Sequence, residues 1–279
     1  MMEMLRHRVR DGVLLRLIGK WLNAGVLEGL ELSYPEAGTP QGGVISPLLA
    51  NIYLHEVLDD WFVRQVQPRL RGRAWLIRYA DDFVIVFERQ EDARRVHEVL
   101  PQRFARFGLT LHPDKTRLLN FRRPDRKNDA DDDDDKGPRT FDLLGFTHVW
   151  GLSRRGKWVV QKRTASSRFS RSLHRLREWC QKHRHDSVEQ QHSTLSQKLR
   201  GHYAYFGITG NSRALGRYFW EVVNAWHKWL SRRSYAAHRT CTWEWMLKLL
   251  QRLPLPRPRI IHRYGLQLKL PQVVAPGRP

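Results

Sequence analysis

Apolar and polar positions follow two different periods in the first half of the chain. Two β-prone runs, Trp75–Ile77 and Phe83–Phe87, flank a short polar segment and predict a hairpin. Apolar residues at helical spacing predict helices over residues 3–24, from Pro47 onward, and over residues 91–107. The helix from Pro47 is apolar on most faces, so we expect it to be buried.

The pattern beyond residue 163 is helical and two-faced. One face of the first helix is apolar and another is basic, so one can pack while the other tracks phosphates. The apolar positions are Phe169, Leu173, Leu176 and Cys180, and the basic positions are Arg168, Arg171, Arg175 and Lys182. Asn211 or Ser212 can cap a later helix whose apolar and aromatic residues, from Leu215 to Leu230, should face inward.

The charge of the chain indicates a polyanionic partner. Its 279 residues carry a net charge of +21, and the pI is about 10.7. Residues 163–240 hold 15 Lys and Arg against 4 Asp and Glu, so over half of the excess lies there. Nucleic acid is the simplest polyanion to fit such a surface.

Several protein classes are disfavoured by what the sequence lacks. No apolar run approaches the ~20 residues of a membrane-spanning helix, and we expect no membrane partner. The first residues do not read as a signal peptide. Cys180 and Cys241 are far apart and suggest neither a disulfide framework nor a zinc site. These features predict a reducing, bacterial-type cytoplasm.

The tip of the predicted hairpin, Tyr79–Asp82, places two carboxylates side by side. Adjacent carboxylates resist joint ionisation unless cations neutralise them. Divalent cations do so and can also clamp the oxygens of a phosphoryl transfer. Aspartate is also common in ordinary turns, so the neighbouring segments must decide between the two interpretations.

The neighbouring segments resemble a known family. The segments Ala37–Leu54, Tyr79–Asp82, Gly108–Thr116 and Phe141–Phe146 occur in the order of the later motifs of a reverse transcriptase palm. The segment Leu199–Ser234 resembles the maturase-specific domain of group II intron reverse transcriptases. This resemblance covers nearly the whole chain. It implies an α+β fold, in which a partial palm (an antiparallel sheet with packed helices) precedes an all-helical thumb/maturase domain.

The glycine-rich loop Gly38–Gly43 suits close approach of the backbone to a flat ligand. Ser46 can cap the helix that follows, with Pro47 at its first position. The resemblance implies that Gln41 and Gly42 contact the incoming nucleotide and the template. Alone, such a loop would more simply be a glycine turn that starts a helix.

The resemblance also implies the catalytic residues and the cofactor, Mg²⁺. It makes Asp81 the metal ligand that acts in catalysis, and Asp82 the supporting acid and second ligand. Tyr79 would pack near the primer end, or simply fill the core as a strand aromatic. Lys115 would lie beside the triphosphate as a general acid, unless it is an ordinary surface lysine. Phe141–Phe146 resembles the strand that grips the primer terminus.

Aromatic residues among Arg and Lys suit RNA binding by stacking and charge. Within the helical region we expect most aromatics to be core and a few to be exposed. The predicted RNA-binding residues are Arg168, Arg171, Arg175, Lys182, His202, Tyr203, Arg232 and Arg233. The alternative is a basic surface that is merely solvated.

The expected domain boundaries follow these motifs. Residues 1–121 form the partial palm, 122–139 an acidic insertion, 140–162 primer-grip-like strands, 163–265 the helical thumb/maturase domain, and 266–279 a tail. The insertion contains Asp131–Asp135, and such a like-charge run is expected to be a solvated, disordered loop.

The family palm also uses a third metal-binding Asp and fingers, which this sequence is expected to lack as an N-terminal truncation. Glu3 and Asp11 fit a solvated helix face and are not expected to replace that Asp. The predicted function is an RNA-directed DNA polymerase and group II intron maturase in splicing and mobility, impaired by the truncation. Its partners would be group II intron RNA, an RNA template with a DNA primer, and deoxynucleoside triphosphates. The alternatives are a non-catalytic RNA-binding maturase remnant and a reverse transcriptase of a retron or defence lineage.

Overall fold

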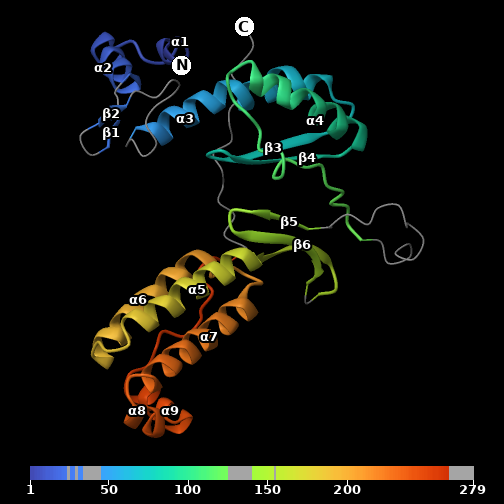
Figure 1. Cartoon of the computed structure of the whole chain (residues 1–279). Coiled ribbons are helices and arrows are strands. Elements are labelled where there is room, and N and C mark those ends of the chain that lie inside the picture. The colour runs from blue at the N-terminus through green and yellow to red at the C-terminus, as the bar shows by residue number, and fades with distance from the viewer. Residues whose placement is uncertain (24–25, 29–30, 34–44, 125–139, 154, 264–279) are drawn as a thin grey trace. The chain divides into compact units, whose positions relative to one another are not determined.

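A computed structural model describes most of the chain (Figure 1). The described residues are 1–23, 26–28, 31–33, 45–124, 140–153 and 155–263. The predicted nucleotide-binding residues Gln41 and Gly42, the Asp131–Asp135 run and the 266–279 tail lie outside them. The chain divides into two compact units, which we call unit 1 (Met1–Leu119) and unit 2 (Asn120–Pro279).

Unit 1 begins with two short helices, α1 (Met2–Arg6) and α2 (Gly12–Leu22). The prediction of one helix over residues 3–24 is therefore wrong. The physical reason is Asp11, whose carboxylate accepts hydrogen bonds from the backbone N–H groups of Val13, at 2.7 Å, and Leu14, at 3.1 Å. This side chain caps a new helix rather than lying on the face of a continuous one.

The rest of unit 1 builds a long helical segment and a hairpin. Strands β1 (Val26–Glu28) and β2 (Glu31–Ser33) pair antiparallel. The helical segment comprises α3 (Ser46–Leu54), the π-helices η1 (His55–Asp60) and η2 (Phe62–Val66), and the 3₁₀ turn η3 (Gln67–Arg69). It leads to β3 (Ala74–Tyr79), β4 (Asp82–Phe87) and α4 (Gln90–Ala105). Ser46 is the first residue of α3, which begins one residue earlier than expected, with Ile45 at the N-cap position.

The hairpin and the helix over residues 91–107 are confirmed as β3–β4 and α4. Helix α4 lies along the hairpin (Figure 1), and the two share a core with η1 and η2. Leu58 and Phe62 are fully buried there, and Phe104 stacks on Phe83 with ring centroids 6.0 Å apart. The expected burial of the helix from Pro47 holds for its later part, whereas Leu48 remains exposed.

Unit 2 contains a three-stranded antiparallel sheet in the order β5 (Thr140–Leu143), β6 (Phe146–Leu152), β7 (Trp158–Thr164). The segment Phe141–Phe146 is therefore not one strand but a strand, a tight turn and the start of the next strand. Leu144 and Gly145 form this turn with φ of 50° and 77°. Positive φ at both central residues matches the twist of the flanking strands.

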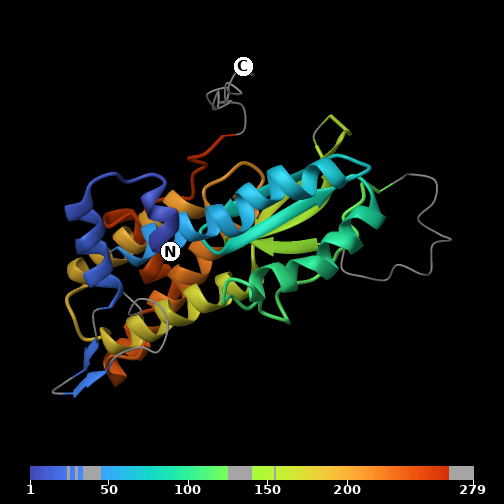
Figure 2. The same cartoon turned by 90° about the horizontal axis from the view of Figure 1, so that it is seen from above.

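The helices of unit 2 are α5 (Ser166–Lys182), α6 (Val188–Phe206), α7 (Ser212–Ser231), α8 (Tyr235–Thr240) and α9 (Trp243–Arg252). Figure 2 shows the same elements from above. The predicted inward face of α5 is confirmed, because Leu173, Leu176 and Cys180 are buried in one core with α6 and α7. Asn211 precedes α7, but its side chain does not cap this helix. Its amide accepts a hydrogen bond from the Thr164 N–H at 3.0 Å and donates one to the Phe206 carbonyl at 2.9 Å.

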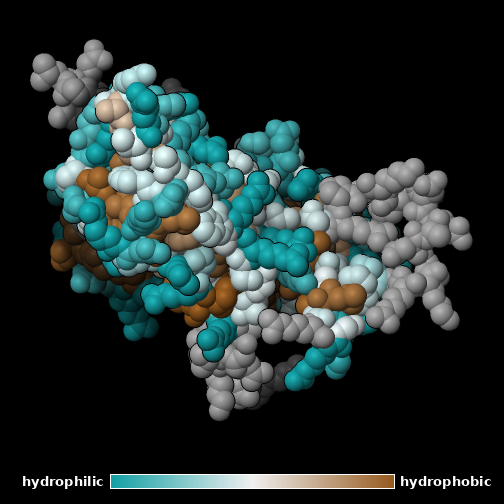
Figure 3. Space-filling model, turned by 90° about the horizontal axis from the view of Figure 1, so that it is seen from below, coloured by the Kyte–Doolittle hydropathy of each residue, from teal (hydrophilic) through white to brown (hydrophobic). Residues whose placement is uncertain are grey.

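The face shown in Figure 3 is mainly hydrophilic, with separate hydrophobic patches. Within the described ranges, no helix has both the length and the apolar character needed to cross a lipid bilayer.

Candidate active site

The two adjacent carboxylates lie at the tip of the β3–β4 hairpin, as the sequence predicts. Tyr79 pairs with Asp82, so Ala80 and Asp81 form a two-residue turn. Ala80 has φ of 53°, a left-handed conformation that few residues with a Cβ adopt. Such an outlier often marks a functional site.

The strand alternation of β3 determines which side chains surround the acids. Trp75, Ile77 and Tyr79 point to the open face of the hairpin and are 49%, 54% and 68% exposed. Because Tyr79 and Asp82 are directly paired, their side chains share this open face. Tyr79 is therefore not a core aromatic of unit 1, and it stands beside one of the two acids.

The carboxylates of Asp81 and Asp82 are exposed, and neither forms a hydrogen bond or an ion pair with a described residue. No group of three acidic, His or Cys side chains in the described ranges could hold a metal ion by itself. Two carboxylates are nevertheless a fitting donor set for Mg²⁺, which usually takes one or two carboxylates together with substrate phosphates and water. The chemistry of the turn therefore fits this cation.

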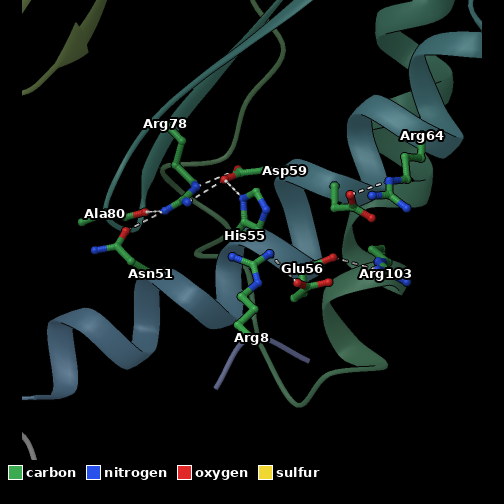
Figure 4. A network of polar contacts seen from close by, with 10 residues as sticks. Arg8, Asn51, His55, Glu56, Asp59, Arg64, Arg78, Ala80 and Arg103 are labelled. Carbon is green, nitrogen blue, oxygen red and sulfur yellow. Dashed lines mark hydrogen bonds and ion pairs between the residues drawn. The ribbon is translucent and has the colours of Figure 1, made fainter. Parts of the chain in front are cut away.

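Arg78 lies just before the turn on the packed face, and its guanidinium makes four hydrogen bonds (Figure 4). It donates to both carboxylate oxygens of Asp59 at 2.8 and 2.6 Å, to Oδ1 of Asn51 at 2.9 Å and to the Ala80 carbonyl at 2.8 Å. The hydrogen bond to Asp59 raises the pKa of the Arg78 guanidinium. The hydrogen bonds of Arg78 are thus to other residues of the protein.

Sequence reasoning missed Asp59 and Asn51 as partners of this site. One signal was present, because β3 alternates Trp75, Ile77 and Tyr79 with Leu76 and Arg78. This alternation places Arg78 on the packed face, where a charged side chain requires a partner.

Lys115 lies on the surface of unit 1, in a turn where its backbone N–H donates to the His112 carbonyl at 3.2 Å. Among the described residues, no hydrogen bond or ion pair joins its ammonium to Asp81 or Asp82. The structure therefore shows an exposed lysine in the unit that carries the acids, without a direct contact between them.

The predicted basic face of α5 in unit 2 is exposed. Its members are Arg168, Arg171, Arg175 and Lys182, and none forms an ion pair with a described residue. By contrast, Arg177 on the same helix donates to Glu221 of α7 at 2.7 Å. Unpaired, exposed cations on one helix face can attract phosphates.

The other four predicted RNA-binding residues differ in their exposure to solvent. The expectation that His202 and Tyr203 lie at the surface is wrong, because they are 8% and 1% exposed. Both belong to the inward face of α6, and the Tyr203 hydroxyl donates to the Pro256 carbonyl at 3.1 Å. Arg232 is exposed, whereas Arg233 is half-buried and donates to the Asp186 carbonyl at 2.5 Å.

A hairpin that presents adjacent carboxylates, on a mixed helix-and-sheet unit, is typical of nucleotidyl-transfer enzymes that use divalent metals. The sequence model of the family "Reverse transcriptase (RNA-dependent DNA polymerase)" matches residues 4–148. This match covers slightly more than half of the chain. The chain therefore belongs to the reverse transcriptase family, whose enzymes are RNA-directed DNA polymerases.

The individual relatives match shorter segments. The chain is 46% identical over 66 residues to "Group II intron-encoded protein LtrA" of Lactococcus lactis subsp. cremoris, covering 24% of the chain and 11% of that protein. It is 31% identical over 151 residues to "Protein YkfC" of Escherichia coli, covering 42% of the chain and 38% of that protein. It is 31% identical over 100 residues to an "Uncharacterized 91 kDa protein in cob intron" of Schizosaccharomyces pombe, covering 36% of the chain and 11% of that protein. The chain thus spans less than half of the length of each of these relatives.

Proposed function

We propose that this chain acts in RNA-directed DNA synthesis, with the Tyr79–Asp82 turn as its metal-binding centre. The observation that carries the proposal is the pair of exposed carboxylates without described partners at the tip of β3–β4. In this proposal unit 1 contributes the palm, and the helices of unit 2 contribute the thumb and maturase domain. The reaction is attack of a primer 3′-hydroxyl on the α-phosphate of a deoxynucleoside triphosphate.

The predicted site residues would have distinct tasks in this reaction. Asp81 and Asp82 would hold Mg²⁺ with their carboxylate oxygens, and Tyr79 would pack against the primer end from the open face. Bound Mg²⁺ supplies neutralisation of the charge on the reacting phosphate oxygens. Lys115 would hold the proton for the pyrophosphate leaving group, and its exposed ammonium is accessible for this role. Gln41 and Gly42 would contact the nucleotide and the template.

We further propose that the RNA bound is a group II intron RNA, and that the protein acts in splicing and mobility of that intron. The likeness to the protein named as group II intron-encoded supports this choice. The exposed cations of α5 would meet the RNA phosphates.

Primer extension on an RNA template with Mg²⁺ tests the polymerase proposal. Asp81→Ala should lower the extension rate at least about 100-fold, because loss of a metal ligand removes several kcal/mol of transition-state stabilisation. Asp60→Ala is the matched control, since Asp60 is an acid of the same unit that pairs with Arg64 at 2.7 Å. Equal extension by the wild type and Asp81→Ala would contradict the assignment.

A second function, RNA binding without polymerisation, is favoured by a separate observation. Unit 2 has its own hydrophobic core and carries the exposed basic face of α5. This function predicts that Asp81→Ala leaves RNA affinity and intron splicing unchanged. Firm, salt-sensitive RNA binding without any extension by the wild type would select it over the polymerase.

A further inference from the structure

Arg78 connects the acidic turn to the helical segment behind it (Figure 4). Its Nη1 donates both to the Ala80 carbonyl, at 2.8 Å, and to Asn51 Oδ1, at 2.9 Å. Its Nε and Nη2 grip the Asp59 carboxylate. One side chain thereby joins the backbone between the two strands to both α3 and η1.

The partners of Arg78 are themselves held in place. The Asn51 side chain donates from Nδ2 to the Pro47 carbonyl at 2.9 Å, so its Oδ1 is turned toward Arg78. The Asp59 carboxylate also contacts His55 Nδ1 at 3.3 Å. The Arg78 side chain is 13% exposed and that of Asp59 is 25% exposed, so solvent competes weakly for this bidentate pair.

The backbone conformation of Ala80 indicates the role of the contacts of Arg78. A residue with a Cβ is disfavoured at φ of 53°, so the surroundings must impose this geometry on Ala80. The only described side chain that the structure shows bonded to the Ala80 carbonyl is that of Arg78. The next two residues along the chain are the acids, and the direction of their side chains follows from this backbone conformation.

We propose that Arg78 is a positioning residue, which sets the Asp81–Asp82 turn for divalent-cation binding by bridging the Ala80 carbonyl to Asp59 and Asn51. This inference rests on the proposed function of the turn. Arg78 does not touch the cation or the nucleotide in this role. Because Asp59 balances its charge, the guanidinium acts mainly through geometry.

Glycine in place of Ala80 would adopt the same turn with less help from Arg78. Glycine adopts positive φ without the penalty of a Cβ. If Arg78 serves to hold Ala80 in this conformation, then Ala80→Gly should make the guanidinium partly dispensable. A merely structural Arg78 would show no such rescue.

Cleavage of the backbone by bound Fe²⁺ measures cation binding at the turn without requiring polymerisation. Carboxylate sites that take Mg²⁺ also take first-row divalent cations, and Fe²⁺ with ascorbate and peroxide cuts the chain beside its binding site. In the wild type we expect cleavage next to Asp81 that Asp81→Ala abolishes. Arg78→Gln should raise the Fe²⁺ concentration needed by about tenfold, the equivalent of one hydrogen bond to a charged group. Ala80→Gly in the Arg78→Gln background should recover most of this loss.

Arg103→Gln provides the matched control. Arg103 is a part-buried arginine of α4 that donates to the Val57 carbonyl at 3.0 Å and the Glu56 carbonyl at 3.3 Å of the same η1 helix. It has no described contact with the turn. Its substitution should lower the melting temperature as Arg78→Gln does, while leaving the Fe²⁺ dependence of cleavage unchanged.

The outcomes distinguish failure of the metal site from failure of the positioning role of Arg78. Cleavage near the turn that persists in Asp81→Ala, or is absent from the wild type, would refute the metal site and with it both proposals. Asp81-dependent cleavage that is equally sensitive to Fe²⁺ in the wild type and Arg78→Gln would refute the positioning role alone. A tenfold loss in Arg103→Gln, or no rescue by Ala80→Gly, would show that Arg78 acts through general stability and would also refute it.

Discussion

The imidazole ring of His202 lies flat against the phenol ring of Tyr218, with ring centroids 3.7 Å apart and planes 6° apart. His202 is buried, and its Nε2 has no hydrogen-bond partner in the described part of the chain. Burial lowers the pKa of this imidazole from 6.5 to about 4. Folded unit 2 therefore holds His202 in its neutral form.

This contact predicts a pH dependence of the stability of unit 2. Between pH 6.5 and about 4 the unfolded chain binds a proton at His202 that the folded chain does not bind. Stability is therefore complete above pH 6.5 and falls as the pH falls through this window, by about 3 kcal/mol in total. Urea unfolding across this window should show a shallower dependence for His202→Phe. His185→Phe, at an exposed position of the same unit, should keep the wild-type slope, and identical slopes for all three proteins would contradict the prediction.

Substitution of the buried side-chain amide of Gln191 should cause a large loss of stability. Its Oε1 accepts from Trp226 Nε1 at 2.8 Å, and its Nε2 donates to the carbonyls of His183, at 2.7 Å, and Asp186, at 3.0 Å. Gln191→Leu would leave the buried Trp226 N–H without its acceptor and remove a donor from two backbone carbonyls, so it should cost about 3 kcal/mol of unfolding free energy. The neighbouring exposed residue gives the control, since Gln190→Leu should change stability by less than about 0.5 kcal/mol. Chemical denaturation compares the two, and equal stabilities would rule out this role of Gln191.

Two glycines of unit 2 should respond to alanine in opposite directions. A Cβ at Gly207 would lie 2.8 Å from the Arg259 carbonyl oxygen and closer still to that of Tyr203, so Gly207→Ala forces backbone shifts. A Cβ at Gly216, within α7, would meet nothing within 4 Å. We expect Gly207→Ala to destabilise by about 1–3 kcal/mol and Gly216→Ala to stabilise by about 0.5–1 kcal/mol. Thermal unfolding measures both, and a shift of the same sign would contradict the geometry.

The sequence predicts well those elements whose signal is local. The β3–β4 hairpin has β-prone runs on both sides of a turn, and α5 has an apolar face at regular spacing, so both are confirmed. The break between α1 and α2 was missed because the apolar period continues through it, although Asp11 offered a capping signal.

The burial of His202 and Tyr203 shows a different limit. Leu195, Leu199 and Tyr203 follow a four-residue spacing along α6, so continuation of the inward face was open to sequence reasoning. Polar atoms on both side chains argued instead for the surface. The burial of both side chains depends on contacts with residues distant in the sequence. The Tyr203 hydroxyl donates a hydrogen bond to the Pro256 carbonyl, and the His202 ring stacks on Tyr218 of α7.

In the candidate site, too, local features could be predicted from the sequence and non-local contacts could not. Asp81 and Asp82 are readable as a pair because they are adjacent, whereas Arg78 and Asp59 are 19 residues apart. The contact between Arg78 and Asp59 depends on how η1 packs against the hairpin, and the pattern of apolar residues does not predict that packing.

The exposed cations of α5 predict a defined change in the salt dependence of RNA binding. Arg171 and Arg175 have no described ion-pair partner, so each is available for a phosphate contact that releases counterions. Arg171→Gln and Arg175→Gln should each weaken RNA binding and lower the slope of log affinity against log salt by about 0.7 to 1. Arg177→Gln is the matched control on the same helix, because the guanidinium of Arg177 is already paired with Glu221. Filter binding at several salt concentrations measures the slopes, and a loss in Arg177→Gln equal to that in the other two variants would exclude a specific role for this face.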